Sequence, residues 1–206
     1  MGREQDSAYY DNNLQIVSTP LEQSPWLPLY KAAEEMIRPF GNEARIADLG
    51  CGTGRFARHI ANLGYRDYIG IDFSEARVKL AQKYVPEFTF ISGDLTKRET
   101  WQMLGQAGIF VALEFLEHID KDLEILGNIP TGSFILFSVP NYDSAGHVRY
   151  FGSMAEVKAR FASVVEWQRS TELVNQKRSL KRFFLALGRH QKRADKRIFL
   201  VLGRRR

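Results

Sequence analysis

Short apolar runs alternate with stretches of helical spacing from about residue 45 onwards, and this alternation restricts the fold more than any other feature. The apolar runs are ARIADLG (44–50), YIGID (68–72), FTFIS (88–92), IFVAL (109–113) and SFILFSV (133–139). Their nearly continuous apolar character is typical of parallel strands that are covered on both faces. Strand and helix in turn therefore predict an α/β fold, with a doubly wound, mostly parallel sheet and helices on both faces.

The N-terminal region lies outside this alternation. Residues 28–40 have the spacing of an amphipathic helix that packs ahead of the first strand, and residues 1–27 are interpreted as an arm. We therefore divide the chain into an N-terminal arm and helix (1–43), expected to act as a lid, and one domain (44–206). Four aromatic residues of this region are expected either to line a pocket or to pack against the core: Tyr9, Tyr10, Trp26 and Tyr30.

Composition restricts the class of protein. The 206 residues are enough for one domain with a core of its own. A single cysteine, Cys51, excludes an intramolecular disulfide and is typical of a reducing compartment. No apolar run reaches the roughly 18 residues that a membrane span needs, and the polar, acidic start does not resemble a secretory signal. We expect a cytoplasmic protein without a membrane span.

The net charge of +5 is unevenly distributed. Residues 1–176 carry 17 basic and 23 acidic side chains, whereas residues 177–206 carry 12 basic and one acidic side chain. Such a basic segment is typical of contact with an anionic partner such as RNA, and equally of a solvated edge. It also contains two similar sequences 15 residues apart, at 181–189 and 196–204. The second predicts a strand over 197–203, and the first is either its antiparallel partner or a helical turn in a loop.

A glycine-rich turn follows the first predicted strand, in the sequence Asp48-Leu49-Gly50-Cys51-Gly52-Thr53-Gly54. Glycines at alternate positions allow a sharp turn and let a ligand approach the backbone amides without interference from Cβ atoms. The helix that follows would point its N-terminus at the same ligand. Arg55 stands where a dinucleotide-binding fold places its third glycine, and no Gly-Lys-Ser/Thr ending follows. These departures argue against an NAD-dependent oxidoreductase and against a phosphate-binding loop. A tight turn without a ligand is the alternative.

The segment IADLGCGTGRFA resembles the first motif of the class I S-adenosylmethionine-dependent methyltransferases, and the resemblance continues through about residues 44–162. It implies a Rossmann-like methyltransferase fold with seven strands and an enzyme of the EC 2.1.1 class. The resemblance assigns the methionine half of the cofactor to Asp48, Gly50, Cys51 and Gly52.

Three later motifs are similar to those that hold the adenosine half of this cofactor. Asp72 closes the second strand, where the family places an acid that accepts hydrogen bonds from the ribose hydroxyls, and Phe73 would lie against the adenine. Asp94 and Leu95 follow the third strand, where the family reads the adenine amino group. Glu114, after the fourth strand, is also assigned to the cofactor pocket. The alternative for Asp94 is a helix cap.

An acid–histidine cluster follows the fourth strand, with Glu114, Glu117 and His118 spaced so that one helical turn would place them on one face. Together with His147, they resemble the metal site of methyltransferases that modify the terminal 2′-hydroxyl of small RNAs, and a similar site in O-methyltransferases of ubiquinone biosynthesis. This resemblance implies Mg²⁺ or another divalent cation. The alternative is that the acid caps the next helix and the histidine only lines the site.

We therefore expect transfer of a methyl group from S-adenosylmethionine to a small hydroxylated substrate. A cation at this cluster would lower the pKa of the acceptor hydroxyl; without one, His118, beside Glu117, is the candidate general base. The alternatives are RNA 2′-O-methylation and a partner protein that binds the cofactor without catalysis.

Overall fold

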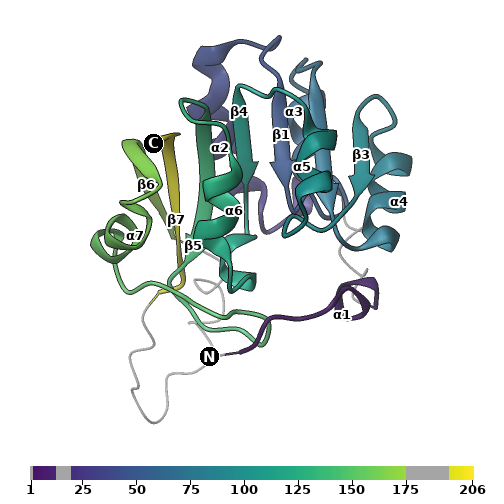
Figure 1. Ribbon diagram of the computed structural model, residues 1–206. Helices are drawn as coiled ribbons and strands as arrows, with labels where there is room; N and C mark the ends of the chain where they lie inside the picture. Colours follow the sequence, from purple (N-terminus) through teal and green to yellow (C-terminus); the bar gives the residue numbers. More distant parts are fainter. Residues whose placement is uncertain (1, 13–19, 175–194) are drawn as a thin grey trace, which may run out of the picture.

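The computed structural model describes residues 2–12, 20–174 and 195–206, and its strands form a single sheet. The strand order is β3-β2-β1-β4-β5-β7-β6 (Figure 1), which confirms the predicted α/β class and the seven strands. The strands are β1 (Ile46–Leu49), β2 (Tyr68–Asp72), β3 (Thr89–Ser92), β4 (Ile109–Ala112), β5 (Phe134–Pro140), β6 (Val165–Val174) and β7 (Arg197–Arg205). Strands β1 to β5 are parallel, and β7 runs antiparallel to both β5 and β6.

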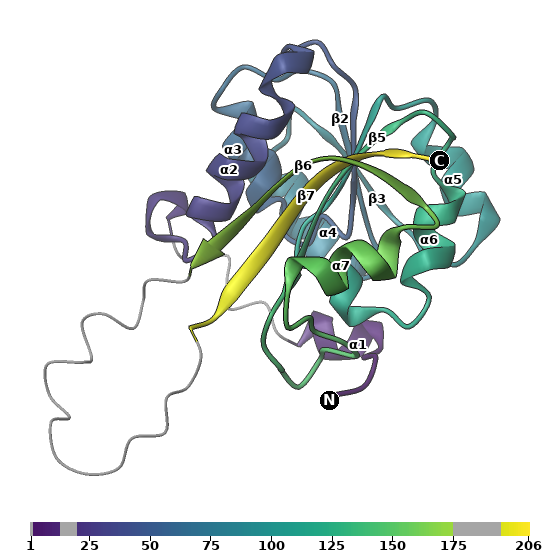
Figure 2. The same cartoon turned by 90° about the vertical axis from the view of Figure 1, so that its left-hand side faces the viewer.

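Helices cover both faces of the sheet (Figure 2), with α2, α3 and α4 on one side and α5, α6 and α7 on the other. The α-helices are α1 (Ser7–Asp11), α2 (Leu27–Ile37), α3 (Arg55–Ala61), α4 (Glu75–Tyr84), α5 (Arg98–Leu104), α6 (Asp122–Asn128) and α7 (Met154–Phe161). The described residues also form three short 3₁₀ helices: η2 (Leu21–Gln23), η3 (Arg38–Phe40) and η4 (Leu116–His118). None of the described helices is long and apolar enough to cross a membrane.

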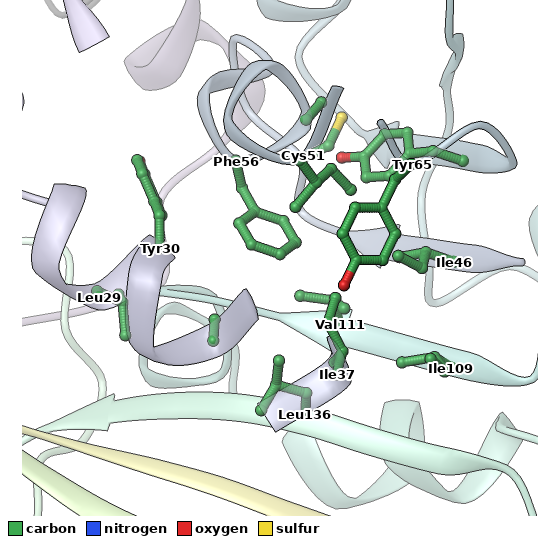
Figure 3. Packing of buried hydrophobic residues seen from close by; sticks show 14 of the residues in the cluster. Leu29, Tyr30, Ile37, Ile46, Cys51, Phe56, Tyr65, Ile109, Val111 and Leu136 are labelled. Atoms are coloured by element: carbon green, nitrogen blue, oxygen red, sulfur yellow. The ribbon is translucent and has the colours of Figure 1, made fainter. Parts of the chain in front are cut away.

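The core consists of two apolar layers, one on each face of the sheet. Figure 3 shows the layer beneath α2 and α3, where Leu29, Ile37 and Phe56 pack with Ile46 and Leu136 of the strands. On the opposite face, aromatic side chains fill the space under α7: Phe137 lies 4.8 Å from Phe161, measured between ring centroids. The two layers fix the central strands, and with them the loops at the strand ends.

The C-terminal strand is where the prediction and the structure differ most. The strand predicted over 197–203 is β7, which is confirmed, but both of its edges are occupied, by β5 and by the unpredicted strand β6. Residues 181–189 lie outside the described residues.

The strand order reverses between β1 and β4. From β1 the chain adds β2 and β3 on one side, and it then returns to add β4 and β5 on the other side. In open α/β sheets, ligands bind beyond the carboxyl ends of strands at such a point. The N-terminal segment with α1 lies across this same edge (Figure 1). The candidate site is therefore sought where residues 2–12 meet the loops that follow β1, β2 and β4.

Candidate functional site

The glycine-rich turn between β1 and α3 has a backbone that requires glycine. Gly50, Gly52 and Gly54 have φ angles of +77°, +54° and +76°, in the left-handed region. The amides of Gly50 and Cys51 both donate to the carbonyl of Ile71, at 2.8 and 2.9 Å. A Cβ atom at Gly50 would lie 2.2 Å from the ring of Phe115, so the turn also packs against the loop after β4.

Gly50→Ala is expected to destabilise the protein more than Gly132→Ala. Both glycines have positive φ, which costs an L-residue about 1–2 kcal/mol, but nothing lies within 4 Å of a Cβ atom at Gly132. The clash with Phe115 adds about 1–3 kcal/mol at Gly50. Urea unfolding of the two variants measures the difference, and equal losses would contradict this account.

Asp72 ties the end of β2 to the glycine-rich turn. One carboxylate oxygen accepts a hydrogen bond from the Gly52 amide and the other from the Ser74 amide, both at 2.9 Å. Burial raises the pKa of this carboxyl group. The side chain therefore holds the turn in place and also borders the space in front of it.

A cavity of about 130 Å³ opens beside Asp72, and its wall includes Phe73, Asp94 and Leu95. The carboxylate of Asp94 accepts hydrogen bonds from the amide and the hydroxyl of Thr96, at 2.8 and 2.7 Å. Because α5 begins only at Arg98 and follows Lys97, Asp94 does not cap it. The structure thus brings all four residues predicted for the adenosine half to one cavity.

A second cavity of about 140 Å³ lies on the other side of the turn and includes Asp48, Cys51 and Gly52 in its wall. Gly50, Arg77 and Glu114 line both cavities, so the two form neighbouring parts of one crevice. The residues predicted for the methionine half therefore lie together, next to those predicted for adenosine.

Asp48 is buried at the base of the second cavity, where the Tyr68 hydroxyl donates a hydrogen bond to its carboxylate at 2.5 Å. Burial raises the pKa of Asp48 to about 7. At neutral pH, the folded chain without ligand therefore holds this carboxyl group partly protonated.

The stability of the ligand-free protein is expected to fall between pH 4 and pH 7, and Asp48→Asn is expected to reduce that fall. The pKa of Asp48 is about 7 in the folded protein, against 3.8 for the ordinary group. Its contribution to the free energy of unfolding is therefore fully present below the ordinary pKa and is lost as pH rises through the folded pKa. One such group changes the free energy of unfolding by about 1.4 kcal/mol per pH unit at most. Urea unfolding at pH 5, 6 and 7 gives the change in the free energy of unfolding with pH for the wild type and for Asp48→Asn. Equal changes in the two proteins would show that Asp48 keeps an ordinary pKa.

Side chains of the N-terminal region complete the crevice. Glu4, Gln5 and Tyr10 line the first cavity, and Trp26 and Tyr30 line the second. Three of the four predicted aromatic residues thus reach a cavity wall. The fourth, Tyr9, is 40% exposed and packs against Tyr10 with ring centroids 5.2 Å apart.

The predicted helical turn from Glu114 to His118 is wrong. Glu114 has a φ angle of +52°, and Phe115 is also non-helical, so only Leu116–His118 form the short helix η4. Glu114 instead points to β5, where its amide donates to the Ser138 hydroxyl at 2.8 Å and its carboxylate accepts from that hydroxyl at 3.2 Å. Burial raises the pKa of Glu114 to about 7.

Glu117, His118 and His147 nevertheless come together, with one potential ligand atom of each lying within 4.8 Å of the others. The contact joins the loop after β4 to the loop after β5, and the two imidazole rings lie 4.9 Å apart. His118 also lines the first cavity, so the cluster borders the crevice. Three of the four predicted metal ligands form this group, and Glu114 does not.

Backbone carbonyls orient both histidines. Nδ1 of His118 lies 2.9 Å from the Gly146 carbonyl, and Nδ1 of His147 lies 3.0 Å from the Tyr142 carbonyl. Because a carbonyl only accepts, each Nδ1 carries the proton and each Nε2 keeps its lone pair, as in histidines that bind metals. Burial lowers the pKa of His118 to about 4 and also lowers that of His147, which keeps both rings neutral.

Glu117 has no exposed surface, and neither of its carboxylate oxygens has a hydrogen-bond partner among the described residues. Burial and the nearby Glu114 raise the pKa of Glu117 well above its ordinary value. A buried carboxyl group without partners is costly unless a cation neutralises it. Glu117 also caps no helix, since Lys121 precedes α6, so the capping alternative is not what the structure shows. One carboxylate and two neutral imidazoles fit a divalent cation.

Three comparisons with known proteins bear on this site. Residues 46–129 match the model of a family described as a methyltransferase domain, whereas no curated protein sequence matches the chain. The N-methyltransferase NodS from Bradyrhizobium japonicum WM9, solved with S-adenosyl-L-homocysteine, is 13% identical with a TM-score of 0.69, over 95% of this chain and 97% of NodS.

Two further solved structures have the same fold. Magnesium protoporphyrin IX methyltransferase from Synechocystis PCC 6803, with bound S-adenosyl-L-homocysteine, is 14% identical with a TM-score of 0.62, over 95% of this chain and 94% of that chain. The [4+2]-cyclase SpnF is 13% identical with a TM-score of 0.67, over 99% of this chain and 98% of SpnF. At such identities the structures show the fold alone. Residues 46–129 are thus similar to a methyltransferase domain, and the chain is an enzyme of the methyltransferase class with the Rossmann-like methyltransferase fold.

Proposed function

We propose that the chain transfers a methyl group from S-adenosylmethionine to a hydroxyl oxygen of a small substrate, with the help of a divalent cation. The observation that carries this proposal is the group of Glu117, His118 and His147 at the edge of the crevice. Its buried carboxyl group, which has no hydrogen-bond partner in the described part of the chain, lies beside two neutral imidazoles, and these three groups are a donor set for a cation.

The crevice supports the choice of methyl donor. Its first cavity offers the carboxylates of Asp72 and Asp94 and the ring of Phe73 to an adenosine, and its second offers the glycine-rich turn to a methionine. Two of the structural neighbours were solved with the demethylated product of this donor. Glu114 lines both cavities and so would lie near the point where the two halves of the donor meet.

Methyl transfer is a displacement at the sulfonium carbon, so the protein mainly aligns the acceptor oxygen and supports loss of its proton. A divalent cation held by Glu117, His118 and His147 would supply Lewis acidity that lowers the pKa of a bound hydroxyl. Glu117 contributes the negative charge at this position, and the carbonyls of Gly146 and Tyr142 hold the two imidazoles in the tautomer that binds. In a reaction without a cation, the neutral Nε2 of His118 is the base placed at the cavity.

The cover of the crevice favours a small acceptor over RNA. Glu4, Gln5 and Tyr10 of the N-terminal segment form part of the wall of the cavity that His118 borders. The ring of Tyr10 lies 6.1 Å from that of His118 and 5.4 Å from that of Phe73, so the N-terminal segment covers the site as a lid would. RNA 2′-O-methylation is the second candidate, because residues 177–206 are strongly basic.

A transfer assay with isotopically labelled S-adenosylmethionine tests the proposal. The acceptors are a panel of small hydroxylated compounds and, separately, a short single-stranded RNA, each with Mg²⁺, with Mn²⁺ and with a chelator. We expect label in a small acceptor and its loss with the chelator. Label in RNA alone would favour the second candidate, and binding of the donor without transfer to any acceptor would favour a partner protein. Turnover that survives the chelator, in protein free of divalent ions by elemental analysis, would exclude the role of the cation.

A further inference from the structure

We propose that Arg149 is a positioning residue, which holds the loop of Glu117 and His118 against the loop of His147. The inference rests on the proposed function, because it assigns to Arg149 the spacing of the three groups that would bind the cation. Arg149 lies two residues after His147 in the chain.

The guanidinium group of Arg149 is surrounded by carbonyls of the opposite loop. Its Nη1 donates to the carbonyls of Leu116, at 2.5 Å, and of Ile119, and its Nη2 donates to the carbonyl of Asp120 at 3.0 Å. These three carbonyls flank Glu117 and His118 on both sides. One side chain thus fixes the backbone of the segment that carries two of the three proposed ligands.

A buried acid holds Arg149 in this position. Asp122, at the start of α6, has no exposed surface and lies 3.4 Å from Nη1 of Arg149. Arg160 of α7 is the second arginine that pairs with Asp122, with its Nη2 at 2.6 Å and its Nε at 3.2 Å from the carboxylate. Replacing either arginine removes one ion pair of Asp122, but of the two only Arg149 contacts carbonyls of residues 116–120.

Two direct hydrogen bonds between the loops show why their relative position matters. The Val148 amide donates to the Glu117 carbonyl at 2.8 Å, and Nδ1 of His118 lies 2.9 Å from the Gly146 carbonyl. A shift of one loop would break both bonds and separate Glu117 from His147. A planar group with five donors can meet three carbonyls and a carboxylate at once, whereas the single ammonium of lysine cannot.

The matched variants Arg149→Lys and Arg160→Lys test this role in the full chain. Mn²⁺ is titrated by calorimetry, S-adenosyl-L-homocysteine is titrated as a probe of the cofactor crevice, and thermal unfolding reports stability. We expect Arg149→Lys to weaken Mn²⁺ binding about 10- to 100-fold and to leave binding of the cofactor product within about twofold. Arg160→Lys should bind Mn²⁺ as the wild type does, because it leaves the three carbonyl contacts in place.

The outcomes separate this inference from the proposed function. A wild-type protein that binds no Mn²⁺ would overturn the metal centre itself, and the positioning role with it. If the wild type binds Mn²⁺ and Arg149→Lys binds it equally well, only the role of Arg149 is overturned. Equal losses of Mn²⁺ affinity in both arginine variants would also overturn it, since the effect would then come from Asp122. Should Arg149→Lys fail to fold, Arg149→Gln replaces it, because a single amide cannot meet the carbonyls of Leu116, Ile119 and Asp120 together. The same loss of Mn²⁺ affinity is then expected, and wild-type affinity would overturn the role.

Discussion

Replacement of Glu117 by glutamine is expected to abolish measurable Mn²⁺ binding and to lower turnover at least about 100-fold. Glutamine keeps the size of the side chain but removes the only negative charge of the group formed with His118 and His147. Both carboxylate oxygens of Glu117 are buried without hydrogen-bond partners among the described residues, so the wild-type side chain can give both to a cation. Calorimetric titration with Mn²⁺ and single-turnover transfer to the acceptor found in the assay measure the two effects.

The control for this variant is Glu166→Gln, which changes an exposed acid on β6 in the same way. It should bind Mn²⁺ and turn over as the wild type does. Glu117→Gln should also keep its affinity for S-adenosyl-L-homocysteine, since Glu117 lines neither cavity. Unchanged Mn²⁺ affinity in Glu117→Gln would mean that these three side chains are not a metal centre.

The second large effect is expected at Asp72, where Asp72→Asn should weaken binding of S-adenosyl-L-homocysteine about 10- to 100-fold. Each carboxylate oxygen accepts from a backbone amide, of Gly52 or of Ser74. The NH₂ group of asparagine would face one of these donors, and a lost hydrogen bond to a charged group costs about 1.5–3 kcal/mol. The glycine-rich turn would then shift, and the oxygens offered to a ribose would be reduced to one.

Asp67→Asn is the matched control. Asp67 lies just before β2, at the opposite end of the strand from Asp72, and its carboxylate forms a long, exposed ion pair with Arg45 at 3.8 Å. Calorimetry with the cofactor product should distinguish the two variants clearly. Wild-type affinity in Asp72→Asn would place the ribose elsewhere in the crevice and would remove the main support for the assigned orientation of the donor.

The fold and the cofactor crevice were largely predictable because their signals are local. The strands that meet the crevice are apolar runs, and the residues predicted to bind the donor stand directly after them, so parallel pairing alone brings Asp48, Asp72, Asp94 and Glu114 to one edge. Strand β6 was missed because its ten residues, VEWQRSTELV, are mostly polar and contain no apolar run, and their strand state depends on pairing with β7.

The acid–histidine group shows the limit of spacing as a guide. Four candidates were predicted from their positions along the chain, and a regular helical turn was assumed to bring three of them to one face. The actual backbone has a positive φ at Glu114, which turns that side chain to Ser138 and leaves the other three candidates together. Arg149 gave no signal in the sequence, since its partners are carbonyls of residues 116, 119 and 120.

The sequence by itself thus determined the α/β class, the glycine-rich turn and the edge of the sheet where a ligand binds, because these follow from periodicity and from residues adjacent to strands. The tertiary structure decided which acid joins the two histidines, and that side chains of the N-terminal segment line the same cavity as His118. The physical reason is that loop backbone conformation depends on distant partners. The loop of Glu117 takes its shape from contacts with Ser138, Val148 and Arg149, which no local pattern encodes.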